Sequence, residues 1–118
     1  MKLSIQSHEN GVIKLHVAGN VSQRAVMLDS EPLAALLGQD AFRETILLDM
    51  SEVAALDSSG VNWLLICQKR MREADGRLVL HSLSPIAKNV IKVLNLQTVF
   101  TMANDVADAQ SLVDGDTR

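Results

Sequence analysis

The chain has 118 residues, the length of one domain, and 47% of them are hydrophobic, so a folded core is expected rather than a disordered chain. Only 3% of the residues are aromatic and none is Tyr, so this core must be built from aliphatic side chains. The formal net charge is −3, and we find no basic cluster beyond Lys69, Arg70 and Arg72, which argues against a nucleic-acid partner.

The amino-terminal stretch MKLSIQSHENG contains no apolar segment, so we expect no signal peptide. No run elsewhere approaches the roughly 20 apolar residues of a membrane-spanning helix, so we expect no membrane insertion. Cys67 is the only cysteine and lies within an apolar helical pattern. A buried, reduced thiol is typical of the cytoplasm, where we expect the protein to act.

The first predicted element is a β-hairpin. Apolar and polar residues alternate on both sides of the turn dipeptide Asn10-Gly11, with apolar residues at Leu3 and Ile5 before it and at Ile13, Leu15 and Val17 after it. Residues 19–22 are expected to form a loop. Pro32 then opens a helix predicted for residues 30–38, which Gly38 ends.

A central strand and a long helix follow. The unbroken apolar run Ile46-Leu47-Leu48 predicts a strand over residues 44–50 that is buried on both faces. After it comes the sequence DSSG at residues 57–60, and then a dense apolar pattern that predicts a helix over residues 59–74. A serine at a helix N-terminus lies where a phosphate is held well. The same residues also fit an ordinary helix cap, which is the more frequent role of such a sequence.

The rest of the chain alternates strands and helices. We predict a strand at residues 77–81, a helix that begins at Ser84-Pro85, a strand at residues 99–102, and a last helix capped by Asn104-Asp105. Such alternation requires crossover connections and a sheet that is covered by helices. For the helix that follows Ser84, we assign the buried face to Ile86, Val90, Val93 and Leu94.

No catalytic constellation is evident. The three histidines, His8, His16 and His81, are scattered and are expected at the surface or at the rim of the sheet. The spacing suggests no Ser/His/Asp set, no phosphate-binding glycine loop and no CxxC motif. We therefore expect no enzyme activity, no metal and no cofactor.

The segment LLDMSEVAALDSSGVNWLLICQKR resembles the signature of the STAS family, the anti-sigma-factor antagonist domains. Asp49 and residues 57–60 match its pattern of a strand ending in Asp and a DSSG or DSTG turn that opens a helix. Residues 84–109 are similar to the second half of the family's domain. The resemblance implies an α/β fold, with one STAS-like domain over residues 1–114 and a flexible tail at 115–118. It also implies a mixed, mostly parallel sheet of four to five strands that begins with an antiparallel hairpin, and helices largely on one face.

The resemblance implies a binding switch rather than an enzyme. In the family, a partner serine kinase, often the anti-sigma factor itself, phosphorylates the hydroxyl residue before the glycine. By this match the acceptor is Ser59, with Ser58 as the alternative. The unphosphorylated form would bind that partner and free its sigma factor, and a serine phosphatase is a further implied partner. The implied partner-binding surface comprises Val21, Ser22, Asp57, Ser58, Gly60, Asn62 and Trp63.

The role of Trp63 stays open at this stage. Trp63 follows Ser59 by one helical turn, so it is either an exposed anchor for a partner or a core residue, with Leu64 and Ile66 favouring the core. Ser22 stands where many family members carry an acid. An alternative function is a structural subunit of a larger assembly, either a stressosome scaffold or the cytoplasmic subunit of a lipid-transporting ABC complex.

Overall fold

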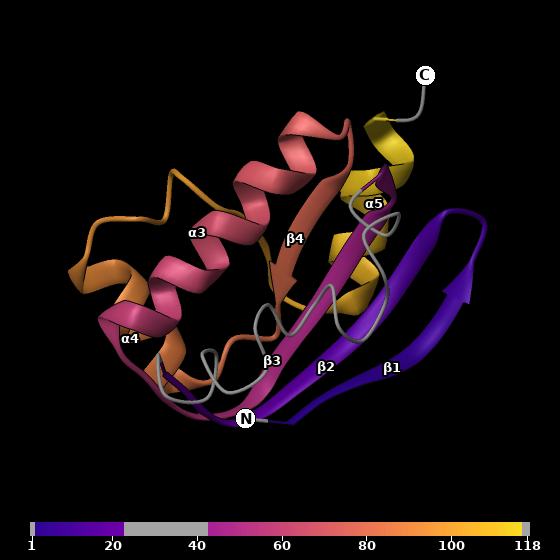
Figure 1. The fold of residues 1–118 in the computed structure, drawn as a ribbon. Helices are drawn as coiled ribbons and strands as arrows, with labels where there is room; N and C mark the ends of the chain where they lie inside the picture. Colours follow the sequence, from indigo (N-terminus) through magenta and orange to yellow (C-terminus); the bar gives the residue numbers. More distant parts are fainter. Residues whose placement is uncertain (1, 23–42, 117–118) are drawn as a thin grey trace.

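The computed structural model describes residues 2–22 and 43–116 (Figure 1). The helix predicted for residues 30–38 lies outside these residues. In chain order, the elements are β1 (Lys2–Glu9), β2 (Val12–Val21), β3 (Thr45–Leu56), α3 (Ser58–Glu73), β4 (Arg77–His81), α4 (Pro85–Val93), β5 (Thr101–Ala103) and α5 (Val106–Asp116).

The strands form one five-stranded sheet in the order β1-β2-β3-β4-β5. The β1–β2 pair is antiparallel and the other three pairs are parallel, which confirms the predicted mixed sheet with its initial hairpin. Asn10 and Gly11 turn the hairpin with φ angles of 53° and 75°. Positive φ at both central residues is what a tight two-residue hairpin turn requires, and this pair of residues adopts it readily.

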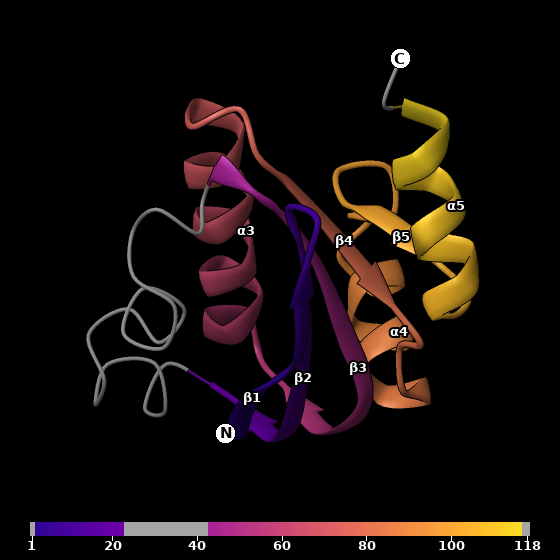
Figure 2. The same ribbon diagram turned by 90° about the vertical axis from the view of Figure 1, so that its right-hand side faces the viewer.

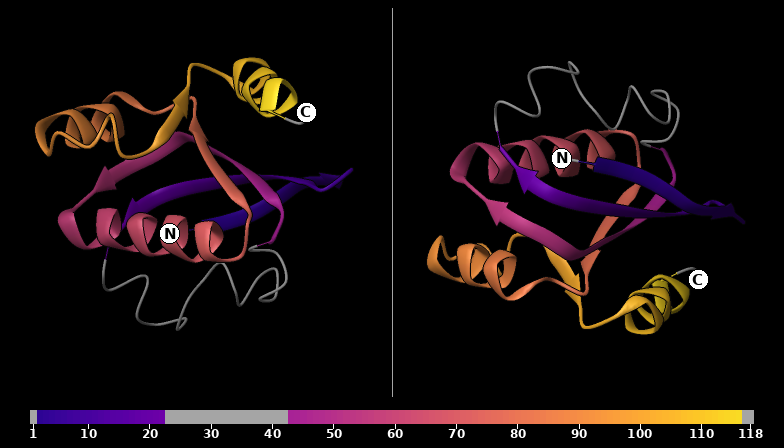
Figure 3. Two further views of the ribbon diagram at one scale, coloured as in Figure 1. Left: turned by 90° about the horizontal axis from the view of Figure 1, so that it is seen from above. Right: turned by 90° about the horizontal axis from the view of Figure 1, so that it is seen from below.

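The helices lie on both faces of the sheet, so the expectation that they gather largely on one face is wrong. Figures 2 and 3 show α3 on one side of the sheet, and α4 and α5 on the other. Ile46 and Leu48 belong to the core cluster that includes α3, whereas Leu47 packs with Ala109 and Val113 of α5. The cause is the alternation of side chains along β3, because a strand that is apolar on both faces needs cover on both.

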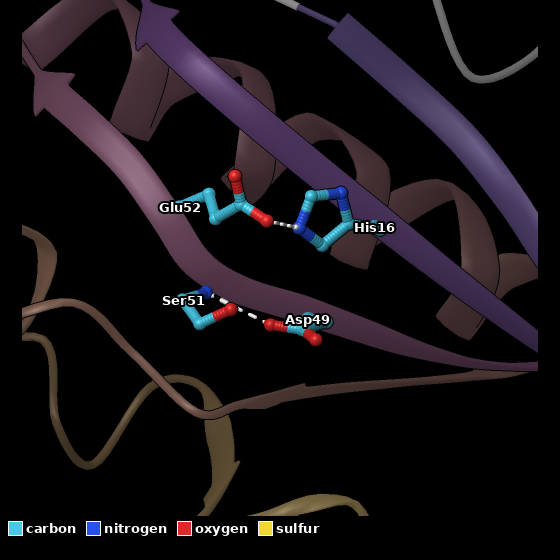
Figure 4. A network of polar contacts seen from close by, with 4 residues as sticks. All are labelled: His16, Asp49, Ser51 and Glu52. Carbon is cyan, nitrogen blue, oxygen red and sulfur yellow. Dashed lines mark hydrogen bonds and ion pairs between the residues drawn. The ribbon is translucent and has the colours of Figure 1, made fainter.

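Strand β3 is longer than predicted, because a bulge accommodates its polar residues. Its register with β2 shifts between the pairs His16↔Asp49 and Ala18↔Glu52. Within the bulge, the Ser51 N–H donates a 2.8 Å hydrogen bond to Asp49 Oδ1, and His16 Nε2 lies 3.1 Å from Glu52 Oε1 (Figure 4). The strand therefore continues through the polar residues and ends at Leu56, directly before Asp57.

Helix α4 begins as predicted but is rotated from the predicted orientation. The Ser84 hydroxyl accepts a hydrogen bond from the Ala87 N–H at 3.2 Å and donates one to the Val53 carbonyl at 2.8 Å. This second bond fixes the start of α4 against the end of β3, and the helix buries Ala87 and Ile91. The predicted buried face is wrong, because three of its residues are exposed: Ile86, Val93 and Leu94.

His81 is buried at 2% exposure, so the prediction that it lies at the surface is wrong. It ends β4 between β3 and β5, paired in register with Asp49 and Ala103. Its Nδ1 lies 2.9 Å from Ser82 Oγ, and its Nε2 has no hydrogen-bond partner among the described residues. Burial lowers the pKa of His81, an effect that the charges of Asp49 and Asp105 oppose.

Across residues 2–22 and 43–116, no helix combines the length and apolar character that crossing a membrane demands.

Candidate functional site

The candidate site is the turn at which β3 passes into α3. Leu56, the last residue of β3, is buried, and α3 begins at Ser58, one residue earlier than predicted. The turn lies at the carboxyl ends of two adjacent parallel strands, since β2 ends at Val21, which pairs with Leu56. In such sheets this edge is where binding sites commonly form, because loops and helix N-termini meet there.

Asp57 caps α3 and also holds Ser59. Its backbone is extended, with φ −97° and ψ 178°, and its Oδ1 accepts hydrogen bonds from the Gly60 N–H at 2.8 Å and from the Ser59 hydroxyl at 2.6 Å. These two bonds, the Ser59 bond first, lower the pKa of Asp57, because both stabilise the carboxylate. The turn therefore carries a fixed negative charge beside Ser59.

Gly60 permits a close contact between α3 and the end of β2. A Cβ atom at this position would collide with the carbonyl oxygen of Val21, so no other residue fits without backbone movement. The same carbonyl accepts a hydrogen bond from the Asp57 N–H at 3.3 Å. The glycine of the DSSG sequence thus has a packing role, and the first turn of α3 is anchored on β2.

The predicted site residues fall into two groups, one at the surface and one buried beneath it. Asp57, Ser58 and Asn62 are exposed, and Ser59 and Ser22 are half-buried. The buried ones are Val21 at 1% exposure, Trp63 at 3% and Gly60. Trp63 is therefore a core residue, as its apolar neighbours favoured, and it offers no exposed anchor in this structure. The buried members position the turn from beneath.

The two serines, which the sequence could not distinguish, differ in their surroundings. The Ser59 hydroxyl is half-buried and hydrogen-bonded to Asp57, whereas Ser58 is exposed at the first position of α3. The first turn of α3 contains no acidic residue. The positive end of the helix dipole can therefore accommodate an added anion.

Asp49, the other residue of the sequence signature, does not join this turn. It lies in the β3 bulge, where it accepts a hydrogen bond from the Ser51 backbone. In the part of the chain that the structure describes, no three His, Cys, Asp or Glu side chains are arranged to hold a metal ion. The chemistry gathered at the turn is thus a hydroxyl, a carboxylate and a helix N-terminus.

Comparison with known proteins agrees with this architecture. A family model described as "Mlab, STAS domain" matches residues 5–103, which is most of the chain. BtrV of Bordetella bronchiseptica, a protein provisionally named an anti-sigma factor antagonist, is 28% identical over 104 residues, covering 88% of this chain and 87% of BtrV.

Solved structures share the fold. A crystal structure of TM1081 from Thermotoga maritima, provisionally named an anti-sigma factor antagonist, has a TM-score of 0.82 at 16% identity and covers 95% of this chain and 94% of that one. The anti-sigma factor antagonist SpoIIAA in its unphosphorylated form has a TM-score of 0.70 at 20% identity, covering 99% and 100%. Phosphorylated SpoIIAA of Bacillus has a TM-score of 0.64 at 19% identity, covering 97% and 98%.

These structural likenesses concern the fold. The family model identifies the family, because its match over residues 5–103 includes most of the hairpin, the central strand, the DSSG turn, α3 and α4. The antagonists of this family are regulatory binding proteins, and the turn described above offers a surface rather than a catalytic centre. The chain belongs to the STAS domain family.

Proposed function

We propose that the chain is a phosphorylation-controlled antagonist of an anti-sigma factor, acting in the cytoplasm, with Ser59 as the phosphoacceptor. One observation carries the proposal. The Ser59 hydroxyl is held by Asp57 at the N-terminus of α3, at the position before Gly60 that the family signature assigns to the acceptor. The names of BtrV and SpoIIAA, and the existence of SpoIIAA in both phosphorylation states, support it.

Phosphorylation of Ser59 would replace the proton that now bonds to Asp57. The phosphate adds about −1.5 to −2 charges beside an ionised carboxylate. The dipole at the helix N-terminus stabilises this added negative charge by about 0.3–1 kcal/mol, which partly offsets the repulsion from Asp57. We therefore expect the turn to lose the Ser59–Asp57 bond while the fold persists, so that the modification changes the charge of the surface and not the architecture.

A partner that covers the unmodified turn would lose affinity for the modified one. It would have to bury a dianion without a matching cation, which costs several kcal/mol, whereas about 1.4 kcal/mol is enough for each tenfold loss of affinity. Release of the partner thus needs no conformational change. The partner is an anti-sigma factor with serine kinase activity, and a serine phosphatase would return the protein to its binding form.

The test is intact-mass analysis with site mapping on the full chain purified from its own cells, with and without stress. We expect a condition-dependent phosphate on Ser59, which Ser59→Ala abolishes and the matched control Ser58→Ala retains. Phosphate on Ser58 alone would overturn the assignment of the acceptor. If no condition yields phosphate on either serine, the switch itself is wrong.

A second candidate function is that of a structural subunit in a larger assembly. The observation that favours it is the exposed apolar side of α4, where Val93 is 73% exposed beside Ile86 and Leu94. A permanent neighbour would cover such a surface. Stoichiometric co-purification of one partner that does not depend on either serine would favour this function over the switch.

A further inference from the structure

A concave surface lies away from the DSSG turn, between α4 and β5. Helix α4 lies on the side of the sheet opposite α3 (Figure 2), and β5 is an edge strand of the sheet. The groove between them has a volume of about 360 Å³, within the range of roughly 300–1,000 Å³ that is typical of small-molecule sites. Its apolar lining consists of Leu83, Ile91, Met102 and Ala103. No residue of the segment 57–63 takes part, so the groove is separate from the proposed phosphorylation site.

Two lysines line the same groove. Lys88 and Lys92 are exposed, and their spacing of four residues brings them to one flank of α4. Neither forms an ion pair with any residue that the structure describes. Gln97 and Asn104 add amide groups, and no acidic residue lines the groove. In a chain with a net charge of −3, this is a local excess of positive charge over an apolar floor.

The rotation of α4 creates this combination. Because the Ser84–Val53 hydrogen bond fixes the start of the helix, Ala87 and Ile91 face the core. On a helix with 100° between successive residues, Lys88 and Lys92 then lie beside Ile91. Had the helix buried Ile86 and Val93 instead, the lysines would point away from β5 and the groove would have no charged rim.

We propose that the groove binds an amphipathic monoanion, an aliphatic carboxylate whose chain lies on Ile91 and Met102 and whose carboxylate is held between Lys88 and Lys92. Lysine ammonium groups act as compact point charges, which suits a single carboxylate, and no arginine fork lines the groove for a bidentate phosphate contact. The apolar floor favours a hydrocarbon over a sugar or a nucleotide, whose polar groups would lose their water without replacement.

The test is a titration of the full ¹⁵N-labelled chain near neutral pH, followed by amide chemical shifts. The probes are octanoate below its micellar concentration, octan-1-ol, which has the same chain without the charge, and acetate, which has the charge without the chain. We expect octanoate to shift the amides of residues 83, 88–92 and 102–104, octan-1-ol to bind roughly tenfold more weakly, and acetate to produce no shift. Equal binding of octanoate and octan-1-ol, or octanoate shifts confined to other residues, would overturn the proposal.

Variants test the role of the lysines. Lys88→Glu/Lys92→Glu should weaken octanoate binding by about tenfold or more, since two favourable charges become unfavourable. The matched control is Lys2→Glu/Lys69→Glu, which makes the same change of net charge at two exposed positions outside the groove and should bind octanoate as the wild type does. If the charge-reversed variant does not fold, Lys88→Gln/Lys92→Gln replaces it. Wild-type affinity in a folded lysine variant would refute the site.

Discussion

The Ser59 hydroxyl donates its hydrogen bond to the same Asp57 oxygen, Oδ1, that accepts the Gly60 N–H and caps α3. One carboxylate oxygen therefore serves both the helix and the proposed phosphoacceptor. A change at Asp57 must affect the stability of the helix start and the environment of Ser59 together, and suitable substitutions can separate the two effects.

Asp57→Ala should destabilise the protein by about 1 kcal/mol through the lost cap, whereas Asp57→Asn should cost less, because Asn caps helices about as well as Asp. Urea unfolding of both variants measures the difference. The control is Glu73→Ala, at the exposed far end of α3. Equal stability of Asp57→Ala and the wild type would show that the cap contributes nothing.

Gly60→Ala should cost more than the loss of the cap. The added methyl group collides with the Val21 carbonyl, and backbone cannot yield as the end of a side chain can, so we expect a loss of about 1–3 kcal/mol or more. Thermal unfolding followed by circular dichroism provides the measurement, and Asn62→Ala, exposed on the same helix, is the control. A melting temperature unchanged by Gly60→Ala would mean that α3 and β2 are not in close contact in solution.

Ser59→Asp should weaken binding of the anti-sigma partner by at least about tenfold and leave the melting curve nearly unchanged, because it adds charge at an accommodating helix N-terminus. Binding is measured by titration calorimetry with the partner recovered from cells. Ser58→Asp is the matched control and should have the smaller effect, since Ser58 does not share the Asp57 bond. A large loss of stability with intact binding would contradict the mechanism.

Acid should destabilise the protein through His81. Burial holds the pKa of His81 below its ordinary value of 6.5, so the unfolded chain takes up a proton more readily than the folded one. The contribution of neutral His81 to the free energy of unfolding is fully present above pH 6.5. It declines as the pH falls from there toward the pKa of His81 in the folded protein. His81→Phe should therefore lose less stability than the wild type between about pH 7.5 and about pH 5. Urea unfolding across this range checks the difference, and Asn62→Ala, which changes no titratable group at an exposed position, should retain the wild-type slope.

The parts of the fold that sequence predicted are those in which neighbouring residues determine the outcome. Asn10-Gly11 prescribes its own turn, and Ser84 with Pro85 prescribes the start of α4. The buried face of α4 was not predictable in this way. Its apolar residues occur in adjacent pairs, at 86–87, 90–91 and 93–94, so the sequence is compatible with two overlapping apolar faces. The hydrogen bond from Ser84 to the Val53 carbonyl determines which of these faces is buried.

The same distinction between local and tertiary determinants applies to the candidate site. The helix cap lies within the four consecutive residues DSSG, so the pattern was sufficient to predict a cap there, and the structure assigns it to Asp57. The contact of Gly60 with Val21 joins residues that are far apart in the chain, and only the parallel pairing of β2 with β3 brings them together. The burial of His81 likewise depends on the strands and helices that cover the end of β4, about which the local sequence RLVLH carries no information.

The irregularity of β1 has a consequence for the behaviour of the protein in concentrated solution. This eight-residue strand is at the edge of the sheet, and its pairing with β2 shifts between Ile5 and Ser7, where Gln6 is an extra residue. A straight edge of this length would be a template on which the strand of another molecule could add. Because the bulge breaks the row of outward backbone groups, an incoming strand would lose its register at Gln6, and the β1 edge is protected against edge-to-edge pairing with another molecule.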